Sequence, residues 1–216
     1  MDFQIHVGFV VSHIHIRNTI ELTNGILMDL PVTLYKSSDF KTVSAIIGAF
    51  FCDILARETG GTVNPIEKGH PDLVPTTALS ATEAELRNYP SGLEIKCTVG
   101  NIQQGANLRA GQQRIRRLTG ITWQAHHREV TALMGLVWDF VNPHNSFLFP
   151  AITGVFYTDR LTEHDWGTIS GTTGRNTKVS GMLTSGKQKM AAGWIMLLAD
   201  AEYLSAFHRI LGTPNF

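Results

Sequence analysis

Hydrophobic and polar residues form two different patterns along the chain. Between residues 39 and 58, apolar side chains recur three or four positions apart, at 43, 46, 47, 50, 51, 54 and 55. This spacing predicts a helix with one buried face, capped by Ser37, Ser38 or Asp39 and ended by Gly60. The runs 130–141 and 150–159 are almost continuously apolar, which favours central strands.

The remaining segments have weaker patterns. Residues 3–35 alternate loosely and predict strands or mixed structure with a turn at 23–25, and shorter strands are expected at 72–75 and 92–99. The connection 80–92 is polar and fits a hairpin or a short helix, 108–118 fits a basic helix, and 192–211 fits a closing helix. The order of elements predicts an α/β or α+β fold with a central mixed β-sheet flanked by helices. We expect one domain over 1–216, with a core at about 38–160 and a C-terminal part at 161–216.

Composition restricts the class of protein. The chain is 43% hydrophobic and only 17% charged, which indicates a globular core and argues against disorder. The sequence has no uninterrupted apolar run of membrane-spanning length, and the N-terminus lacks the basic lead of a signal peptide. We therefore expect a cytoplasmic protein with no membrane association. Cys52 and Cys97 lie in apolar surroundings and are interpreted as buried thiols in a reducing compartment.

The net charge of zero hides an uneven distribution of charge. The stretch 103–128 contains five arginines and no acid, and the stretch 168–189 contains four basic residues and no acid. Such stretches are typical of a phosphate-binding surface, although two solvated basic segments without a partner would look the same.

Two short strands carry charges that need an explanation. In "LEIKCTVG", Glu94 and Lys96 fall on one face of the strand, because side chains alternate with a period of two. If Asp72 lies at the end of an adjacent strand, its carboxylate meets that of Glu94, and a divalent cation between them would remove the repulsion. Mg²⁺ prefers such oxygen ligands, and Lys96 would lie close enough to orient a water or offset charge on a phosphate.

Pro71-Asp72 followed by Glu94-Ile95-Lys96 resembles the signature of the PD-(D/E)XK nucleases. The resemblance covers a little over half of the chain and is closest to the type II restriction endonucleases. It implies a restriction-endonuclease-like core with Asp72, Glu94 and Lys96 as catalytic residues. It also implies Mg²⁺ bound by Asp72, Glu94 and the backbone of Ile95, with Asp53 or Glu58 of the preceding helix as a further ligand.

The resemblance further implies hydrolysis of double-stranded DNA at a short, palindromic site, which leaves 5′-phosphate and 3′-hydroxyl ends. A homodimer and a companion DNA methyltransferase are expected, since two-fold symmetry in the DNA favours it in the protein. Both basic stretches and the histidine pair supply the expected DNA contacts to backbone and bases. The candidate DNA-binding residues are Arg109, Gln112, Gln113, Arg114, Arg117, His126, His127, Arg175, Asn176, Lys178 and Lys187.

Other functions are less consistent with the sequence. The adjacent histidines at 126 and 127 do not match a ββα-metal nuclease, and the chain has no zinc-type Cys pair. It also lacks a phosphate-binding GxxxxGK[ST] loop and a GxSxG nucleophile elbow. Two alternatives stay open: a structure-specific repair or junction nuclease with the same motif, and a non-catalytic nucleic-acid-binding module.

Overall fold

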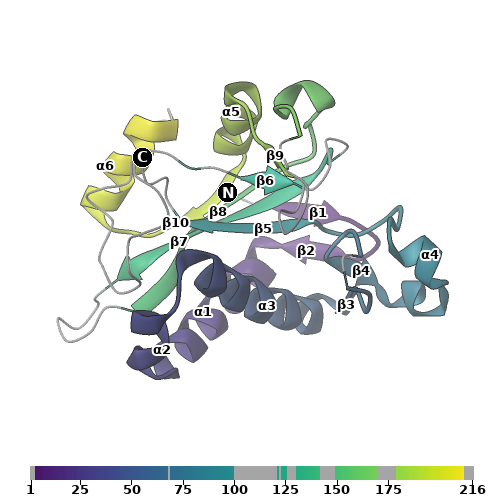
Figure 1. Ribbon diagram of the computed structural model, residues 1–216, viewed down its shortest axis with the longest axis horizontal. Helices are drawn as coiled ribbons and strands as arrows, with labels where there is room; N and C mark the ends of the chain where they lie inside the picture. The colour runs from purple at the N-terminus through teal and green to yellow at the C-terminus, as the bar shows by residue number, and fades with distance from the viewer. Residues whose placement is uncertain are drawn as a thin grey trace.

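A four-stranded mixed sheet with helices on both faces forms the centre of the molecule (Figure 1). The computed structural model describes residues 3–67, 69–99, 121, 123–125, 130–141, 149–169 and 179–211. The strands are β1 (Gln4–His6), β2 (Val10–Ser12), β3 (Gly61–Val63), β4 (Leu73–Pro75), β5 (Ile95–Val99), β6 (Gln124–Ala125), β7 (Leu133–Val141), β8 (Phe149–Thr158), β9 (Ser180–Gly181) and β10 (Trp194–Leu197). The α-helices are α1 (His13–Asp29), α2 (Val32–Ser37), α3 (Phe40–Thr59), α4 (Glu83–Leu86), α5 (Thr184–Ala192) and α6 (Ala201–Leu211).

The central sheet has the strand order β10-β8-β7-β5. Strand β5 runs parallel to β7, whereas β7 pairs with β8 and β8 with β10 in antiparallel fashion. An antiparallel bridge between Leu73 and Leu93 connects the β3–β4 ribbon to the start of β5. These pairings confirm the predicted mixed α/β architecture.

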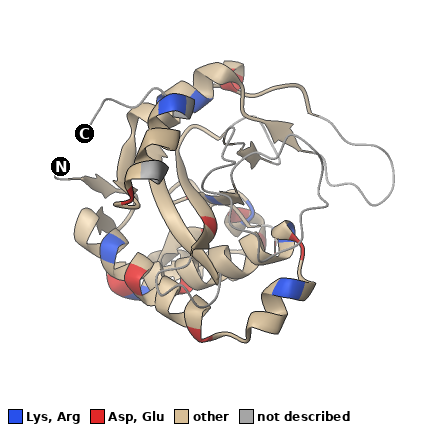
Figure 2. Ribbon diagram, turned by 90° about the vertical axis from the view of Figure 1, so that its left-hand side faces the viewer, with Lys and Arg blue, Asp and Glu red and all other residues tan. Residues whose placement is uncertain are grey.

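Two hydrophobic clusters fill the space between the layers. Helices α1 and α3 lie on one face of the sheet, and α5 and α6 lie on the other (Figure 1). The cluster on the α1 and α3 side includes Ile16, Ile47 and Trp138, and the second is built around Trp123 and Phe156. Charged residues lie mainly on helices and connections, while the long central strands are almost entirely uncharged (Figure 2). This distribution explains the low charge content of the sequence.

Helix α3 confirms the strongest helical pattern in the sequence. Its buried face includes Val43, Ile47 and Phe51, and each such side chain contributes about 2 kcal/mol of burial free energy. The carboxylate of Asp39 accepts a hydrogen bond from the backbone N–H of Thr42 and so caps the first turn. Gly60 ends the helix at a φ of 71°, a left-handed conformation that glycine adopts without strain.

The structure corrects two predictions about secondary structure. Residues 23–25 do not form a turn, because α1 continues through them and buries Thr19 and Thr23 on its inner face. Residues 192–211 are not one helix. The apolar run from Trp194 to Leu197 instead pairs with β8 as an edge strand of the central sheet, and the helix begins only at Ala201.

No helix in the described ranges is long and apolar enough to cross a membrane.

An ion pair between Lys189 and the buried carboxylate of Asp165 fixes α5 to the segment that follows β8. The carboxylate of Asp165, only 2% exposed, accepts hydrogen bonds from Lys189 Nζ at 2.6 Å and from the Thr162 backbone N–H at 2.8 Å. Burial opposes ionisation of this carboxyl group, but the hydrogen bonds from Lys189, Ser185 and Thr162 outweigh it and lower the pKa of Asp165 to about 2. The interaction ties α5 to the core.

Asp165→Asn is expected to lower the free energy of unfolding at pH 7 by about 2–3 kcal/mol. Because the folded-state pKa lies below the ordinary value of 3.8, this stabilisation is present above pH 4 and disappears as the pH falls toward 2. Urea unfolding of both proteins at a series of pH values measures the difference. A difference that stayed constant down to pH 2 would contradict an electrostatic origin, and Asp159→Asn at an exposed aspartate serves as control.

Candidate active site

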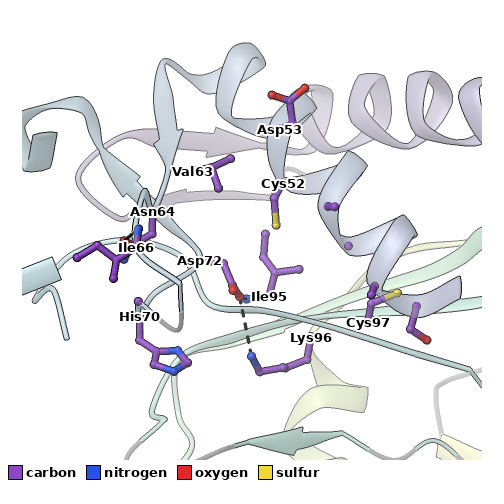
Figure 3. A pocket seen from close by; sticks show the side chains of 15 residues that line it. Cys52, Asp53, Val63, Asn64, Ile66, His70, Asp72, Ile95, Lys96 and Cys97 are labelled. Carbon is purple, nitrogen blue, oxygen red and sulfur yellow. Dashed lines mark hydrogen bonds and ion pairs between the residues drawn. The ribbon is translucent and has the colours of Figure 1, made fainter. Parts of the chain in front are cut away.

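Asp72, Glu94 and Lys96 meet at the junction of the β3–β4 ribbon with β5. The ammonium Nζ of Lys96 lies 2.5 Å from Oε1 of Glu94. It also lies 4.0 Å from Oδ2 of Asp72, the contact that the dashed line marks in Figure 3. The side chains of Glu94 and Lys96 are 8% and 20% exposed, so this cation contacts both carboxylates in a largely buried setting. Two acids separated by 21 residues in the chain thus share one cation.

Backbone geometry brings the two acids together. Leu73 and Leu93 exchange backbone hydrogen bonds in both directions, and the backbone N–H of Ile95 donates to Oδ2 of Asp72 at 2.7 Å. Gly92 permits this close approach, since a Cβ atom there would lie 2.1 Å from the carbonyl oxygen of Leu73. Gly92 also has a φ of 145°, which side-chain-bearing residues rarely adopt.

The surroundings raise the pKa of Asp72 and of Lys96 but lower the pKa of Glu94. Burial and the negative charge of Glu94 raise the pKa of Asp72 to about 6. Burial also opposes ionisation of Glu94, but the hydrogen bond with His70 and the charge of Lys96 lower the pKa of Glu94 to about 2. Burial disfavours the charged form of Lys96, yet the carboxylates of Asp72 and Glu94 outweigh it and raise the pKa of Lys96. The site therefore favours a positive charge between its two acids.

A cavity of about 750 Å³ is lined by Asp72 and Lys96, whereas Glu94 lines a smaller cavity of about 180 Å³. The other wall of the larger cavity is a small-residue face of α3, which includes Ser44, Gly48 and Cys52. Cys52 points from α3 into the cavity, whereas the carboxylate of Asp53 points away from Asp72 (Figure 3). Small side chains on the helix leave space beside Asp72 and Lys96 for a ligand.

The helix acids implied by the resemblance have other partners in this structure. The carboxylate of Asp53 is 64% exposed and pairs with Arg57 one turn later, at 2.7 Å. Glu58 accepts a hydrogen bond from the side-chain amide of Asn18 at 3.1 Å. The structure thus brings Asp72, Glu94, Lys96 and the backbone of Ile95 together, and it directs the carboxylate of Asp53 elsewhere.

The cysteines expected to be buried thiols are both free and half-buried. Burial raises the pKa of each thiol, so both remain protonated at neutral pH.

Most candidate DNA-binding residues cannot be located relative to this site. Lys187 is partly exposed on α5, beyond the face of the sheet opposite α3. The others fall outside the described residues: Arg109, Gln112, Gln113, Arg114, Arg117, His126, His127, Arg175, Asn176 and Lys178.

Asn64 is a site-supporting residue that sequence reasoning missed. Its buried amide nitrogen donates to the carbonyl oxygens of Pro71 at 3.1 Å and Leu86 at 2.9 Å. Its side-chain amide oxygen accepts a hydrogen bond from the backbone N–H of Ile66. The backbone N–H of Asn64 donates to the carbonyl oxygen of Asp72. Asn64 therefore fixes the loop that presents Asp72. The only local signal was an Asn-Pro pair after a glycine pair, which is typical of an ordinary turn.

Asn64→Ala is expected to lower the free energy of unfolding by about 2–3 kcal/mol, because the buried carbonyls of Pro71 and Leu86 lose their donor. Denaturant unfolding measures this loss. Asn88→Ala, at an exposed position, should change stability by less than about 0.5 kcal/mol. Equal effects in the two variants would show that the amide network contributes nothing specific.

Comparison of the chain with protein-family models, curated proteins and solved structures found no match.

Proposed function

We propose that this protein is a magnesium-dependent endonuclease of the PD-(D/E)XK type, and specifically a type II restriction endonuclease. The observation that carries the proposal is the convergence of Asp72, Glu94 and Lys96, of which Asp72 and Lys96 line a cavity of about 750 Å³. A sequence motif of this kind arises often by chance, but such a match gives no reason for its acids to meet in space. Their convergence gives the motif a physical basis.

The arrangement of strands also supports a restriction-endonuclease-like core. A helix precedes the β3–β4 ribbon, and a bridge from Leu73 to Leu93 joins β4, which begins just after Asp72, to the residue before Glu94. Strand β5, which begins just after Glu94 and contains Lys96, lies parallel to β7. A parallel pair needs a crossover connection, and residues 100–132 provide a connection of sufficient length. The described elements follow the order that the resemblance implies, and the helix expected at 108–118 lies outside the described residues.

The donor set fits a magnesium ion. Within the described ranges, no three His, Cys, Asp or Glu side chains form a ready-made metal cluster. Mg²⁺ does not require one, because it retains several waters and is commonly held by one or two carboxylates together with substrate phosphates. Asp72, Glu94 and the carbonyl of Ile95 would hold the ion, where it would supply Lewis-acid catalysis. The cation of Lys96 now lies against the same two carboxylates.

The residues of the chain have separate roles in the proposed hydrolysis. Asp72 and Glu94 place negative charge where the cation binds, and Ile95 holds Asp72 through its backbone N–H. Lys96 orients the attacking water and offsets the charge that develops on the phosphate. The water oxygen bonds to phosphorus while the bond from phosphorus to the 3′ oxygen breaks, which gives a 5′-phosphate and a 3′-hydroxyl. Cleavage of both strands at a palindromic site favours a homodimer, with a methyltransferase protecting host DNA.

Digestion of plasmid and phage DNA by the purified protein, with Mg²⁺ or with EDTA, tests the proposal. Discrete fragments that appear only with Mg²⁺ are expected, and mapping their ends would define the recognition site. A smear, or cleavage confined to branched DNA, would favour a structure-specific nuclease instead. DNA binding without magnesium-dependent cleavage by the folded protein would indicate a non-catalytic binding module.

A further inference from the structure

His70 and Lys96 contact different oxygens of the Glu94 carboxylate. The ring nitrogen Nδ1 of His70 lies 3.2 Å from Oε2 of Glu94, while Nζ of Lys96 lies 2.5 Å from Oε1. The two contacts come from different parts of the chain, His70 from the loop before β4 and Lys96 from β5. The Glu94 carboxylate is therefore held at both oxygens, which fixes its rotation as well as its position.

The backbone of His70 is itself fixed. Its N–H donates to the carbonyl oxygen of Arg87 at 3.2 Å, and its carbonyl oxygen accepts from the N–H of Tyr89 at 2.7 Å. These bonds attach the loop before β4 to the connection between α4 and β5. The imidazole thus projects from a backbone segment held on both sides, and its side chain is only 19% exposed.

His70 also lies where two cavities meet. It lines the 750 Å³ cavity beside Asp72 and a second cavity of about 180 Å³ between residues 88–94 and 130–132. Asp72 lines the first cavity and Glu94 lines the second. The imidazole therefore borders the cavities of both acids. His70 therefore contacts the Glu94 carboxylate at the boundary between the two cavities.

We propose that His70 is a positioning residue that orients Glu94 for binding of a divalent cation. This inference rests on the proposed function, since it assumes that the two acids hold a metal. His70 acts through Glu94 and is not itself assigned as a ligand, because it forms no three-residue metal cluster in the described part of the chain. Restraint of Oε2 directs Oε1 toward the space shared with Asp72 and Lys96. Loss of such an outer partner typically weakens metal binding by roughly 10–100-fold.

Titration of the purified, full-length protein with Mn²⁺ alone, followed by the electron paramagnetic resonance signal of the free ion, measures this effect without DNA. His70→Ala should weaken Mn²⁺ binding by at least about tenfold. His70→Asn should restore binding to within about threefold of wild type, because the asparagine amide lies near the place of Nδ1. His164→Ala, at an exposed histidine, is the matched control and should bind as wild type does.

The comparison with asparagine separates positioning from a purely structural role. A fold defect would weaken binding with a matching loss of thermal stability, whereas loss of positioning weakens binding in a protein of wild-type circular dichroism. If His70→Ala does not fold, His70→Gln takes its place, since its amide extends to the position of Nε2 and misses Glu94. Mn²⁺ binding within twofold of wild type in His70→Ala or His70→Gln would overturn the inference, as would failure of His70→Asn to restore it.

The outcomes for His70 and for the nuclease proposal are distinguishable. Wild-type cleavage of DNA together with unchanged Mn²⁺ binding in the His70 variants would leave the nuclease and remove the positioning role. Mn²⁺ binding that depends on His70, in a protein that cleaves no DNA, would leave the positioning role and remove the nuclease. Absence of Mn²⁺ binding by the wild type would overturn both.

Discussion

Asp72→Asn is expected to abolish magnesium-dependent DNA cleavage and to give a more stable protein. The cleavage rate should fall by about a thousandfold or more, which corresponds to about 4 kcal/mol of transition-state stabilisation. Asparagine keeps the size of the side chain and can still accept the hydrogen bond from the N–H of Ile95. It lacks the negative charge that binds the cation. The loss of activity would therefore not come from a collapsed site.

The gain in stability follows from the pKa of Asp72. In the folded protein this pKa is about 6, above its ordinary value of 3.8, so the folded state holds the proton more tightly than the unfolded chain. Stability consequently falls as the pH rises from about 4 to about 6 and stays lowered above that range. Asparagine does not ionise, so the variant avoids this loss, by about 1–2 kcal/mol at pH 7 after allowance for solvent screening.

Two measurements check the Asp72 prediction together. Plasmid cleavage in Mg²⁺ gives the rate, and urea unfolding without metal at pH 4 and pH 7 gives the stability difference. Asp29→Asn, at an exposed aspartate near the end of α1, is the control and should change neither. Cleavage at the normal rate by Asp72→Asn would remove Asp72 from the site. Wild-type stability at pH 7 in an inactive variant would show that burial and the charge of Glu94 do not raise the pKa of Asp72 in the metal-free protein.

Strong periodic patterns made a large part of the fold predictable. Helix α3 was predicted because its apolar residues recur three or four positions apart, and strands β7 and β8 because their runs are almost continuously apolar over nine or more positions. Helix α1 was missed because threonines occupy part of its buried face. The buried hydroxyl of Thr19 donates a hydrogen bond to the carbonyl oxygen of His15 within the helix. A pattern of hydrophobic residues does not reveal that a threonine can be buried in this way.

Strand β10 shows a different limit. Four consecutive apolar residues beginning at Trp194 fit a helix or a strand equally well, and only the free edge of β8 decides in favour of a strand. The polar segment before it gave no indication of α5, whose buried positions include Gly186 and Ala191. Small residues of this kind carry little hydrophobic signal even where packing is close.

Some residues of the candidate site were also predicted from the sequence, and others were missed. Asp72, Glu94 and Lys96 were identified because a two-residue period and a charged strand are visible in the sequence. Asn64 and His70 were not identified, since each acts through partners remote in sequence: Leu86 lies 22 residues from Asn64, and Glu94 lies 24 residues from His70. Residues that catalyse can follow a motif, whereas residues that hold the motif in place depend on how the chain is folded around it.

Lys96→Met is expected to lower the cleavage rate by about 100-fold or more while strengthening metal binding. The ammonium group lies between the two acids and competes with a divalent cation for the same negative charge. Methionine fills a similar volume without charge, so Mn²⁺ should bind about tenfold more tightly. Cleavage should nevertheless fall, because nothing replaces the cation that orients water and offsets charge on the phosphate.

The same substitution should increase the stabilisation of the folded protein by metal. Without metal, Lys96→Met leaves the buried carboxylate of Glu94 without its closest cation and should lower the free energy of unfolding by about 2–3 kcal/mol. A divalent cation then takes the place of the lysine, so the melting temperature of the variant should rise more steeply with Mn²⁺ than that of the wild type. Calorimetry with and without Mn²⁺ measures this, with Lys36→Met at an exposed lysine as control.

The combination of tighter binding with slower cleavage is what identifies the lysine as catalytic. A merely structural lysine would lose metal binding, stability and cleavage together when replaced. A lysine that only neutralises charge would give tighter metal binding with cleavage close to normal, because the metal would supply the missing charge. Cleavage within tenfold of wild type by Lys96→Met would therefore restrict the lysine to holding the two acids together before the metal arrives. Weaker Mn²⁺ binding would show instead that its ammonium group does not occupy the place of the cation.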